Sequence, residues 1–304
     1  MRVLMSGSRG FIGSELARLL VANGHSVVPI VRGMPGKGEV GWDVGQMTID
    51  TTALEADGDS GLEHMDAAIH LAGEPIRPKR LSSKYRQALT TSRVDSGLLL
   101  SQALAKLKAP PAVYVSGSAI GFYGNRGDER LTEDSARGSG FLADLCQKWE
   151  DSASPAHQAG IRVVFLRTGI VLGPHGFLAA QTPLFRFNLG AKLGNGRQWL
   201  SWISVADEIG IIMHAIENGA VSGPINCTAP EPVRNSEFTD SLAKEMHRKA
   251  FLRIPETPLR MALGSAADEL LFASQRVLPG LATTTGYQFQ YPHLGDALRV
   301  ALEK

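Results

Sequence analysis

The sequence predicts an α/β fold in which a Rossmann-like, doubly wound parallel sheet carries a smaller C-terminal substrate subdomain. Through the first two thirds of the 304 residues, short apolar runs alternate with longer helical patterns. The runs lack the polar–apolar alternation of a half-exposed strand, which indicates strands covered by helices on both faces. A glycine-rich turn follows the first run, where a nucleotide-binding sheet of this class needs one.

The elements of this sheet are expected in a regular order. Strands are predicted at 2–7, 26–31, 67–73, 112–118 and 162–173, with helices between them at 11–23, 83–107 and 140–159. The first helix has an apolar face and ends at Asn23-Gly24, a pair suited to a left-handed cap.

The pattern changes after Gly173. Segments 174–200 and 228–238 contain many chain-breaking residues and are predicted to be largely irregular. Helices are then expected at 238–249, 258–274 and 294–303, with a short strand at 283–292. We therefore expect an NADP-binding domain over 1–173, to which 203–227 returns, and a substrate/C-terminal subdomain built from 174–202 and 228–304.

The composition excludes several classes of partner. Lys plus Arg number 31 and Asp plus Glu number 30, so no net field draws the chain to nucleic acid or anionic lipid. Cys146 and Cys227 lack the spacing of a metal site or a disulfide framework and indicate a reducing, cytoplasmic location. The N-terminus has no targeting pattern, and no apolar run has the length of a membrane span. We expect a small-molecule substrate and no metal. Helices 83–107 and 140–159 either pair two subunits as a homodimer or face solvent.

The glycine-rich turn predicts a phosphate-binding loop. Gly7 permits a sharp turn, Gly10 lets the backbone approach a pyrophosphate, and Gly13 lets the helix pack closely on the strand. The helix N-terminus adds N–H groups and partial positive charge. The residues expected to contact the cofactor here are Gly7, Ser8, Arg9, Gly10, Phe11, Ile12 and Gly13.

The end of the second strand indicates which dinucleotide binds. An NAD site would carry a carboxylate there to accept hydrogen bonds from the ribose 2′-hydroxyl, but this chain has Arg32. A guanidinium suits a 2′-phosphate, so NADP(H) is favoured, and Arg9 could contact the same phosphate. The alternative is that Arg32 is only a solvated charge at a strand end.

Several longer motifs resemble those of one family. They are "HLAGEPI" (70–76), "SGSAIGFYGNRGDERLTEDS" (116–135), "FLADLCQKWE" (141–150), "LRTGIVLG" (166–173) and "SWISVAD" (201–207). Together they resemble the extended short-chain dehydrogenases/reductases, and more narrowly an atypical branch described as nucleoside-diphosphate-sugar epimerase-like, or YfcH-type. The chain after residue 258 resembles the small C-terminal domain of that branch.

The resemblance implies further cofactor contacts at the ends of the sheet strands. Asp43 would lie near the adenine, and Leu71, Ala72 and Gly73 near the phosphates and ribose. The nicotinamide would lie beside the strand ends formed by Ser116, Gly117, Arg167, Thr168, Gly169 and Ile170. Ligands of open α/β sheets bind beyond the carboxyl ends of the strands, which independently favours these positions.

The same resemblance raises a difficulty about catalysis. In the superfamily a Tyr hydroxyl transfers the proton and a Lys four residues later, on the same helix face, lowers its pKa. The corresponding helix here is 141–150, with Phe141 at the Tyr position and Leu145 at the Lys position, and neither can transfer a proton. Cys146 is an alternative nucleophile, although a lone helical Cys is more often a small buried apolar residue.

Ser118 and Tyr123 are therefore the candidate catalytic residues. The alternatives are that Ser118 caps a turn and that Tyr123 only lines the pocket. For the substrate pocket we expect Glu74, Arg186, Trp199 and Trp202, although the two tryptophans could instead form a seam between the domains.

Two classes of function are compatible with these residues. The first is an NADP(H)-dependent oxidoreductase or epimerase (an isomerase) that acts on a small carbonyl or sugar-like substrate. The second is an NADP(H)-binding regulatory or redox-sensing protein without turnover, which the absence of the Tyr/Lys pair favours. The loops at 116–129 and 197–204 carry more polar and aromatic side chains than the retention of a cofactor requires, which favours the enzyme.

Overall fold

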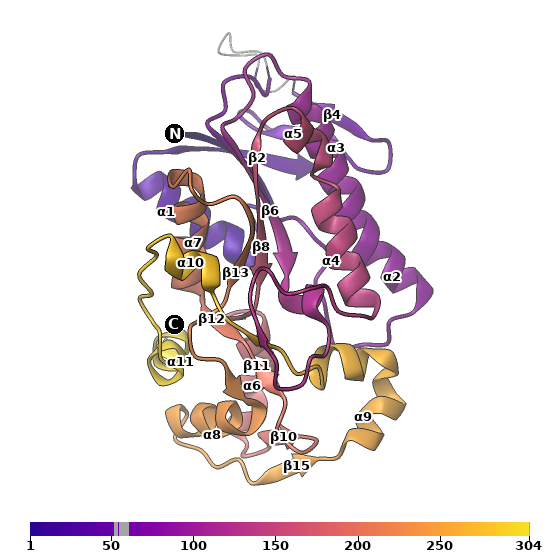
Figure 1. Cartoon of the computed structure of the whole chain (residues 1–304), viewed down its shortest axis with the longest axis vertical. Helices are drawn as coiled ribbons and strands as arrows, with labels where there is room; N and C mark the ends of the chain where they lie inside the picture. Colours follow the sequence, from indigo (N-terminus) through magenta and orange to yellow (C-terminus); the bar gives the residue numbers. More distant parts are fainter. Residues whose placement is uncertain (52–53, 55–60, 304) are drawn as a thin grey trace.

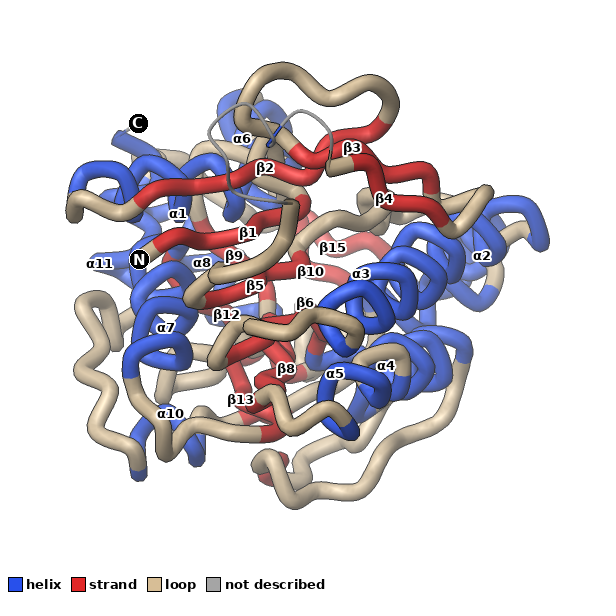
Figure 2. Tube along the Cα trace, turned by 90° about the horizontal axis from the view of Figure 1, so that it is seen from above, coloured by secondary structure: helices blue, strands red, loops and turns tan. Residues whose placement is uncertain are grey.

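A computed structural model describes residues 1–51, 54 and 61–303 and contains one large sheet between two layers of helices (Figures 1 and 2). The sheet has eight strands in the order β13-β8-β6-β5-β1-β2-β3-β4, and its neighbours are parallel except β3 and β4. The strands are β1 (Arg2–Ser6), β2 (Ser26–Arg32), β3 (Val40–Asp43), β4 (Thr48–Asp50), β5 (Ala67–His70), β6 (Val113–Ala119), β8 (Arg162–Thr168) and β13 (Gly223–Cys227).

Helices cover both faces of this sheet. One face packs against α1 (Phe11–Ala22) and α7 (Val205–Glu217), and their apolar side chains share a core with the central strands. The other face packs against α3 (Ser96–Ala105) and α5 (Ser154–Gln158). The expected doubly wound α/β fold is confirmed, and the nearly continuous burial of β1, β5 and β6 explains why these strands are apolar at successive positions.

The long predicted helices are interrupted. Segment 83–107 consists of α2 (Ser83–Thr90), a π-helical turn η2 (Thr91–Asp95) and α3. Segment 140–159 divides into α4 (Phe141–Asp151) and α5, whose start is marked by Pro155. A π-helical turn inside a helix often occurs at a functional site.

The C-terminal half forms a smaller group of elements with its own apolar core, drawn below the sheet in Figure 1. Its helices are α6 (Phe177–Arg186), α8 (Asn235–Glu245), α9 (Glu256–Leu263), a π-helical turn η4 (Ala267–Leu271) and α11 (Leu294–Glu303). Helix α10 (Gly280–Thr284) belongs instead to the core of the large sheet, where it packs beside β13. A short 3-10 turn, η3 (Ile120–Tyr123), follows β6 in the large domain.

Four short strand pairs connect segments that are far apart in the sequence. They are β9 (Ile170–Leu172) with β12 (Trp202–Ser204), β10 (Ala191–Leu193) with β15 (Leu252–Ile254), β11 (Trp199–Leu200) with β14 (Val233–Arg234), and β7 (Arg130–Leu131) with β16 (Arg276–Val277). The last pair brings the chain after η4 back against the large domain.

Four local predictions are wrong. Segment 174–200, expected to be largely irregular, contains the helix α6 and the short strands β10 and β11. The strand expected at 162–173 breaks at Gly169, where a Cβ would lie 2.7 Å from the Ser201 carbonyl oxygen. The helix expected at 258–274 breaks at Gly264, whose φ of 61° is left-handed. The strand expected at 283–292 is absent among these described residues, because Thr283 and Thr284 belong to α10 and no ladder follows.

Candidate functional site

The glycine loop joins β1 to α1 with the geometry that its spacing predicts. Gly7 has a φ of 75°, and a Cβ there would lie 2.7 Å from the backbone of Leu71. A Cβ on Gly13 would lie 2.2 Å from the Gly7 carbonyl oxygen, so glycine is required for the helix to approach the strand. No side chain caps the N-terminus of α1, which leaves its first N–H groups available to an anion.

A cavity of about 530 Å³ opens above this loop, next to the position where the strand order reverses between β1 and β5. Of the sequence-predicted residues it brings together Gly7, Ser8, Arg9, Gly10, Arg32, Leu71, Ala72, Gly73 and Glu74. The lining residues that the sequence did not indicate are Ile30, Val31, Trp42, Val44, Pro75, Ser92 and Ser96.

Two guanidinium groups line the cavity near the end of β2. Arg32 is exposed, and Arg9 forms an ion pair with Glu39, at 2.8 Å from Nη2 to Oε1, while its side chain stays 77% exposed. Both can therefore turn toward an anionic ligand. The acidic lining residue, Glu74, follows β5 rather than β2.

Three residues of the glycine-rich turn and Asp43, all expected to contact the cofactor, lie outside this lining. Phe11 stacks edge-on against His175 at 5.5 Å, and Ile12 packs on the apolar core. Gly13 instead allows α1 to pack closely on the Gly7 carbonyl. The Asp43 carboxylate accepts the Gln46 N–H at 3.0 Å, and its neighbours Trp42 and Val44 line the cavity instead.

A buried histidine supports the strand ends beneath the cavity. The His70 ring lies between the hydroxyls of Ser6 at 2.7 Å and Ser96 at 3.1 Å, and it is fully buried. Burial lowers the pKa of His70 to about 4, so the ring is neutral at physiological pH. Its role is to hold β1, β5 and α3 together.

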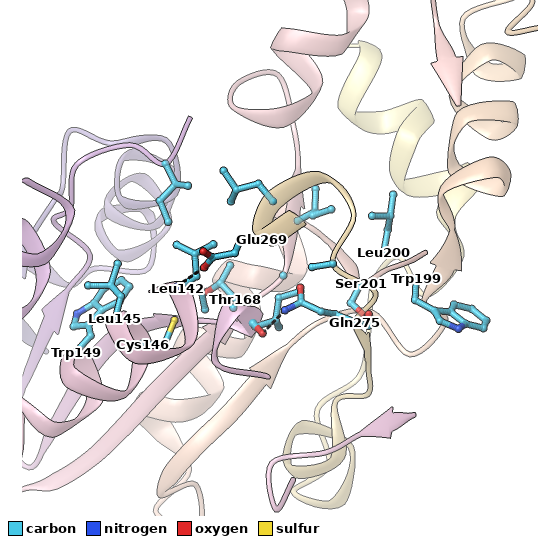
Figure 3. Close-up of a pocket in the computed structure, with 18 of the residues that line it drawn as sticks. Leu142, Leu145, Cys146, Trp149, Thr168, Trp199, Leu200, Ser201, Glu269 and Gln275 are labelled. Atoms are coloured by element: carbon cyan, nitrogen blue, oxygen red, sulfur yellow. Dashed lines mark hydrogen bonds between the residues drawn. The ribbon is translucent and has the colours of Figure 1, made fainter. Parts of the chain in front are cut away.

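A second, smaller cavity of about 170 Å³ lies beside the first. Figure 3 shows residues that line it. Segments 74–76 and 92–93 supply neighbouring residues to both cavities. The remaining walls come from α4, the chain after β6, the break between β8 and β9, β11, and the η4 segment. The wall residues are mostly apolar: Ile76, Ala119, Ile120, Leu142, Leu145, Ile170, Leu200, Leu270 and Ala273 are among them.

Helix α4 presents only part of the expected face to this cavity. Leu142, Leu145, Cys146 and Trp149 line it, while Phe141 lies outside the lining, with the Arg86 guanidinium 4.9 Å from its ring. Two pairs four residues apart therefore face the cavity, Leu142 with Cys146 and Leu145 with Trp149. Burial raises the pKa of Cys146 to about 12, so its thiol is protonated and is no nucleophile at neutral pH.

The two candidate catalytic residues point into a buried polar network instead of a cavity. The Ser118 hydroxyl donates to Glu150 Oε1 at 2.7 Å, and the Tyr123 hydroxyl donates to Asn226 at 2.7 Å and accepts from Arg167 at 3.0 Å. Tyr123 is fully buried, and burial raises its pKa. Neither residue lines either cavity, so the geometry gives them a supporting role.

The other residues expected beside the nicotinamide are divided between the network and the small cavity. Arg167 pairs with Glu150 in the network, and the Ser116 hydroxyl donates to the Gly117 carbonyl at 3.3 Å. The Gly117 Cα faces Trp149, because a Cβ there would lie 2.7 Å from the indole. The three residues that line the small cavity are Thr168, Gly169 and Ile170.

Thr168 links the small cavity to a buried acid that the sequence did not indicate. Its hydroxyl donates to Glu208 Oε1 at 2.8 Å, and Glu208 on α7 is fully buried. Glu208 Oε2 has no hydrogen-bond partner among the described residues. Burial raises the pKa of Glu208 to about 8, so this carboxyl holds a proton at neutral pH.

Of the residues expected in the substrate pocket, one lines the small cavity. That residue is Trp199 (Figure 3). Its Nε1 donates to Asp128 at 2.9 Å. Trp202 is fully buried in the core of the C-terminal group, and its Nε1 donates to the Glu231 carbonyl. Arg186 is exposed at the end of α6, away from both cavities.

Within the described ranges, no cluster of three or more His, Cys, Asp or Glu side chains could hold a metal ion. The same residues include no helix with the length and apolar character needed to cross a membrane.

The sequence is similar to known families and to known proteins along nearly its whole length. The family model described as "NAD dependent epimerase/dehydratase family" matches residues 3–227, and that of a domain of unknown function, DUF1731, matches residues 254–301. Epimerase family protein ML0860 of Mycobacterium leprae is 40% identical over 301 residues, which cover 98% of this chain and 95% of that protein. Human epimerase family protein SDR39U1 is 36% identical over 303 residues, with 98% and 99% covered.

Solved structures agree with these sequence matches. The crystal structure of human SDR39U1 (isoform 2) with NADPH has a TM-score of 0.89 at 34% identity, and the match covers 100% of this chain and 99% of that one. A UDP-glucose 4-epimerase from Thermotoga maritima, solved with UDP-glucose, has a TM-score of 0.76 at 17% identity and shows the shared fold. The sequence matches, the glycine loop and the eight-stranded sheet lead to one conclusion: the chain belongs to the NAD-dependent epimerase/dehydratase family.

Proposed function

We propose that this protein binds NADP(H) in the large cavity and is an oxidoreductase or epimerase that acts on a small carbonyl or hydroxyl substrate in the small cavity. The solved relative with NADPH, at 34% identity over the whole chain, supports the choice of cofactor. So do the uncapped N-terminus of α1 for the pyrophosphate and the Arg9 and Arg32 guanidiniums for a 2′-phosphate.

The observation that carries the proposal of turnover is the hydrogen bond between Thr168 and Glu208. The Thr168 hydroxyl lines an apolar cavity beside the cofactor cavity, and behind it lies a buried carboxyl that is protonated at neutral pH. A general acid is most effective when its pKa lies near the working pH. The pair thus replaces the proton donor that α4 lacks.

A reduced nicotinamide supplies a hydride when it is bound. The chain must then deliver a proton to the substrate oxygen. In our proposal the Thr168 hydroxyl, which donates to Glu208 Oε1 in the structure, turns its hydrogen to the substrate oxygen, and the protonated Glu208 carboxyl then donates from Oε1 to the Thr168 oxygen. One proton moves along each of these two bonds, so that a carbonyl becomes a hydroxyl, Thr168 remains a hydroxyl and Glu208 becomes a carboxylate. Water entering the empty cavity returns the proton by the same route, and oxidation runs the steps in reverse. The apolar walls exclude competing water during the reaction.

The binding protein without turnover is the second candidate. It is favoured by the absence from α4 of a Tyr/Lys pair four residues apart, since Leu142 and Cys146 face the cavity there. Binding of NADP(H) alone does not require an apolar cavity with a proton-bearing pair on its wall, which favours the enzyme.

The test uses NADPH deuterated at the transferable position with a panel of small carbonyl compounds, and NADP⁺ with a panel of nucleotide sugars. A product that gains deuterium identifies an oxidoreductase, and an inverted carbon centre without net oxidation identifies an epimerase. Tight NADPH binding without either product would contradict the proposal and favour the binding protein.

A further inference from the structure

Arg93 occupies an unusual position between the two cavities. It lies in the π-helical turn η2 between α2 and α3, and its side chain lines the small cavity. The guanidinium carbon packs against Gly73, a residue of the large cavity, 3.1 Å from where a Cβ would stand. On its other side the guanidinium lies 5.0 Å from the centre of the Trp149 ring.

The Arg93 guanidinium is buried without an opposite charge in contact. The residue is 7% exposed, and its Nε has no hydrogen-bond partner among the described residues. Nη1 makes two long contacts, of 3.4 Å to the Leu89 carbonyl and 3.4 Å to the Ser92 hydroxyl. No described carboxylate lies within 4.0 Å, and burial lowers the pKa of this arginine, although a guanidinium keeps its charge in proteins.

Arg167 shows what a satisfied guanidinium looks like in the same protein. It is 4% exposed, and Glu150 pairs with it through two hydrogen bonds of 2.9 Å. A buried charge without a partner is costly, because its lost hydration is not replaced. Arg93 therefore carries a charge that a ligand, rather than the fold, is placed to neutralise.

A second donor in the same wall also lacks a partner. Trp149 Nε1 is buried without a hydrogen bond to any described residue, and the Trp149 ring both lines the small cavity and faces Arg93. Arg93 and Trp149 thus present unpartnered donors to the cavity, which matches a ligand that carries acceptor oxygens.

We propose that Arg93 binds the carboxylate of the substrate, so that the reaction acts on a small, largely apolar oxo acid or hydroxy acid. This inference rests on the proposed function and narrows its substrate class. The cavity of about 170 Å³ is close to the roughly 150 Å³ of an engineered apolar cavity that holds benzene. A nucleotide sugar is several times larger than such a ligand.

The charges in the cavity favour a monoanion. Arg93 supplies one positive charge, and Glu269 also lines the cavity, with Oε2 accepting the Leu142 N–H at 2.7 Å. A phosphate dianion would meet repulsion from Glu269, whereas a carboxylate can form a fork with the guanidinium of Arg93.

The test is a calorimetric titration with benzoate and with benzamide, its neutral counterpart of the same shape, with and without saturating NADPH. The variants are Arg93→Met and Arg93→Gln, and the matched control is Arg86→Met, which removes a guanidinium from α2 that lines neither cavity. Affinity for NADPH is measured separately by fluorescence.

We expect the unaltered protein and the Arg86 variant to bind benzoate at least about tenfold more tightly than benzamide, as a charge-assisted pair predicts. Both Arg93 variants should lose this preference and keep NADPH affinity within about threefold. Benzoate selectivity that survives in both variants would overturn the inference. So would a loss of NADPH affinity beyond about tenfold with selectivity retained, because Arg93 would then serve the cofactor. Arg93-dependent selectivity without any turnover would support the anion site while refuting the proposed reaction.

Discussion

Arg167 and Glu150 form a two-point ion pair in the interior, with Nε 2.9 Å from Oε1 and Nη2 2.9 Å from Oε2. The pair joins β8 to α4, and the hydroxyls of Ser118 on β6 and Tyr123 on η3 are bonded to it. These contacts hold β6, η3, β8 and α4 together, and other residues in or next to these four elements line the small cavity. The network is therefore a scaffold for the site.

Removing Arg167 should destabilise the protein strongly. Arg167→Met leaves the Glu150 carboxylate buried without a partner, and such a loss costs about 3–5 kcal/mol. Urea denaturation measures this free energy of unfolding. Arg93→Met is the matched control, because it removes a buried charge that has no partner, and it should be neutral or stabilising. Equal losses for the two variants would contradict the distinction between them.

Ser118 and Tyr123 should matter for stability more than for chemistry. We expect Ser118→Ala and Tyr123→Phe each to cost about 1–3 kcal/mol, since each leaves a buried partner less well bonded. Their turnover numbers, measured below the unfolding temperature, should fall by less than about tenfold. A fall of about a hundredfold or more, typical of a lost general acid, would return either residue to the catalytic machinery.

Arg32→Asp should reverse the cofactor preference. The exposed Arg32 guanidinium lines the large cavity at the end of β2, where an aspartate would repel a 2′-phosphate and accept hydrogen bonds from a ribose hydroxyl. We expect the ratio of NADPH to NADH affinity to fall by at least about tenfold, measured by fluorescence titration. An unchanged ratio would remove Arg32 from the phosphate site.

The stability of the protein should depend on pH through Glu208. Its pKa in the folded protein is about 8, against 4.5 for an ordinary glutamate, so the folded state holds its proton more tightly than the unfolded state. The resulting stabilisation is complete below about pH 4.5, decreases as the pH rises and is lost above about pH 8. The slope is at most about 1.4 kcal/mol per pH unit.

Glu208→Gln should remove this component. The stability of the variant relative to the unaltered protein should then increase between pH 5 and pH 8, as followed by urea denaturation at several pH values. A constant difference across that range would show that Glu208 does not hold its proton in the folded state.

The large cavity was predictable because its signals are local. Gly7, Gly10, Gly13 and Arg32 belong to one strand–helix–strand unit, and the spacing along the chain fixes their relative positions. Asp43 was misplaced by one residue relative to the cavity, because the sequence alone does not give the side on which each residue of β3 faces.

The small cavity could not be predicted in the same way. Leu142, Thr168 and Glu269 come from α4, the end of β8 and the η4 segment, and only tertiary packing brings these segments together. The resemblance located α4 and Leu145, which lines the small cavity, but Phe141 lies outside the lining and Leu142 within it, since a shift of one residue rotates a helix face by about 100°. Arg93 and Glu208 belong to none of the motifs recognised in the sequence. Both are buried, and each has an atom without a hydrogen-bond partner among the described residues, which only the folded structure reveals.

The most direct test of the account is the rate of NADPH oxidation, followed by the near-ultraviolet absorbance of the reduced nicotinamide, with small apolar oxo acids as substrates. The unaltered protein and Thr168→Ser should consume NADPH, and the rate should fall above about pH 8 as Glu208 loses its proton. Thr168→Val, which keeps the shape but cannot relay a proton, should be slower by about a hundredfold or more. Equal rates for Thr168→Val and the unaltered protein, or no consumption with any carbonyl compound despite tight NADPH binding, would contradict the account.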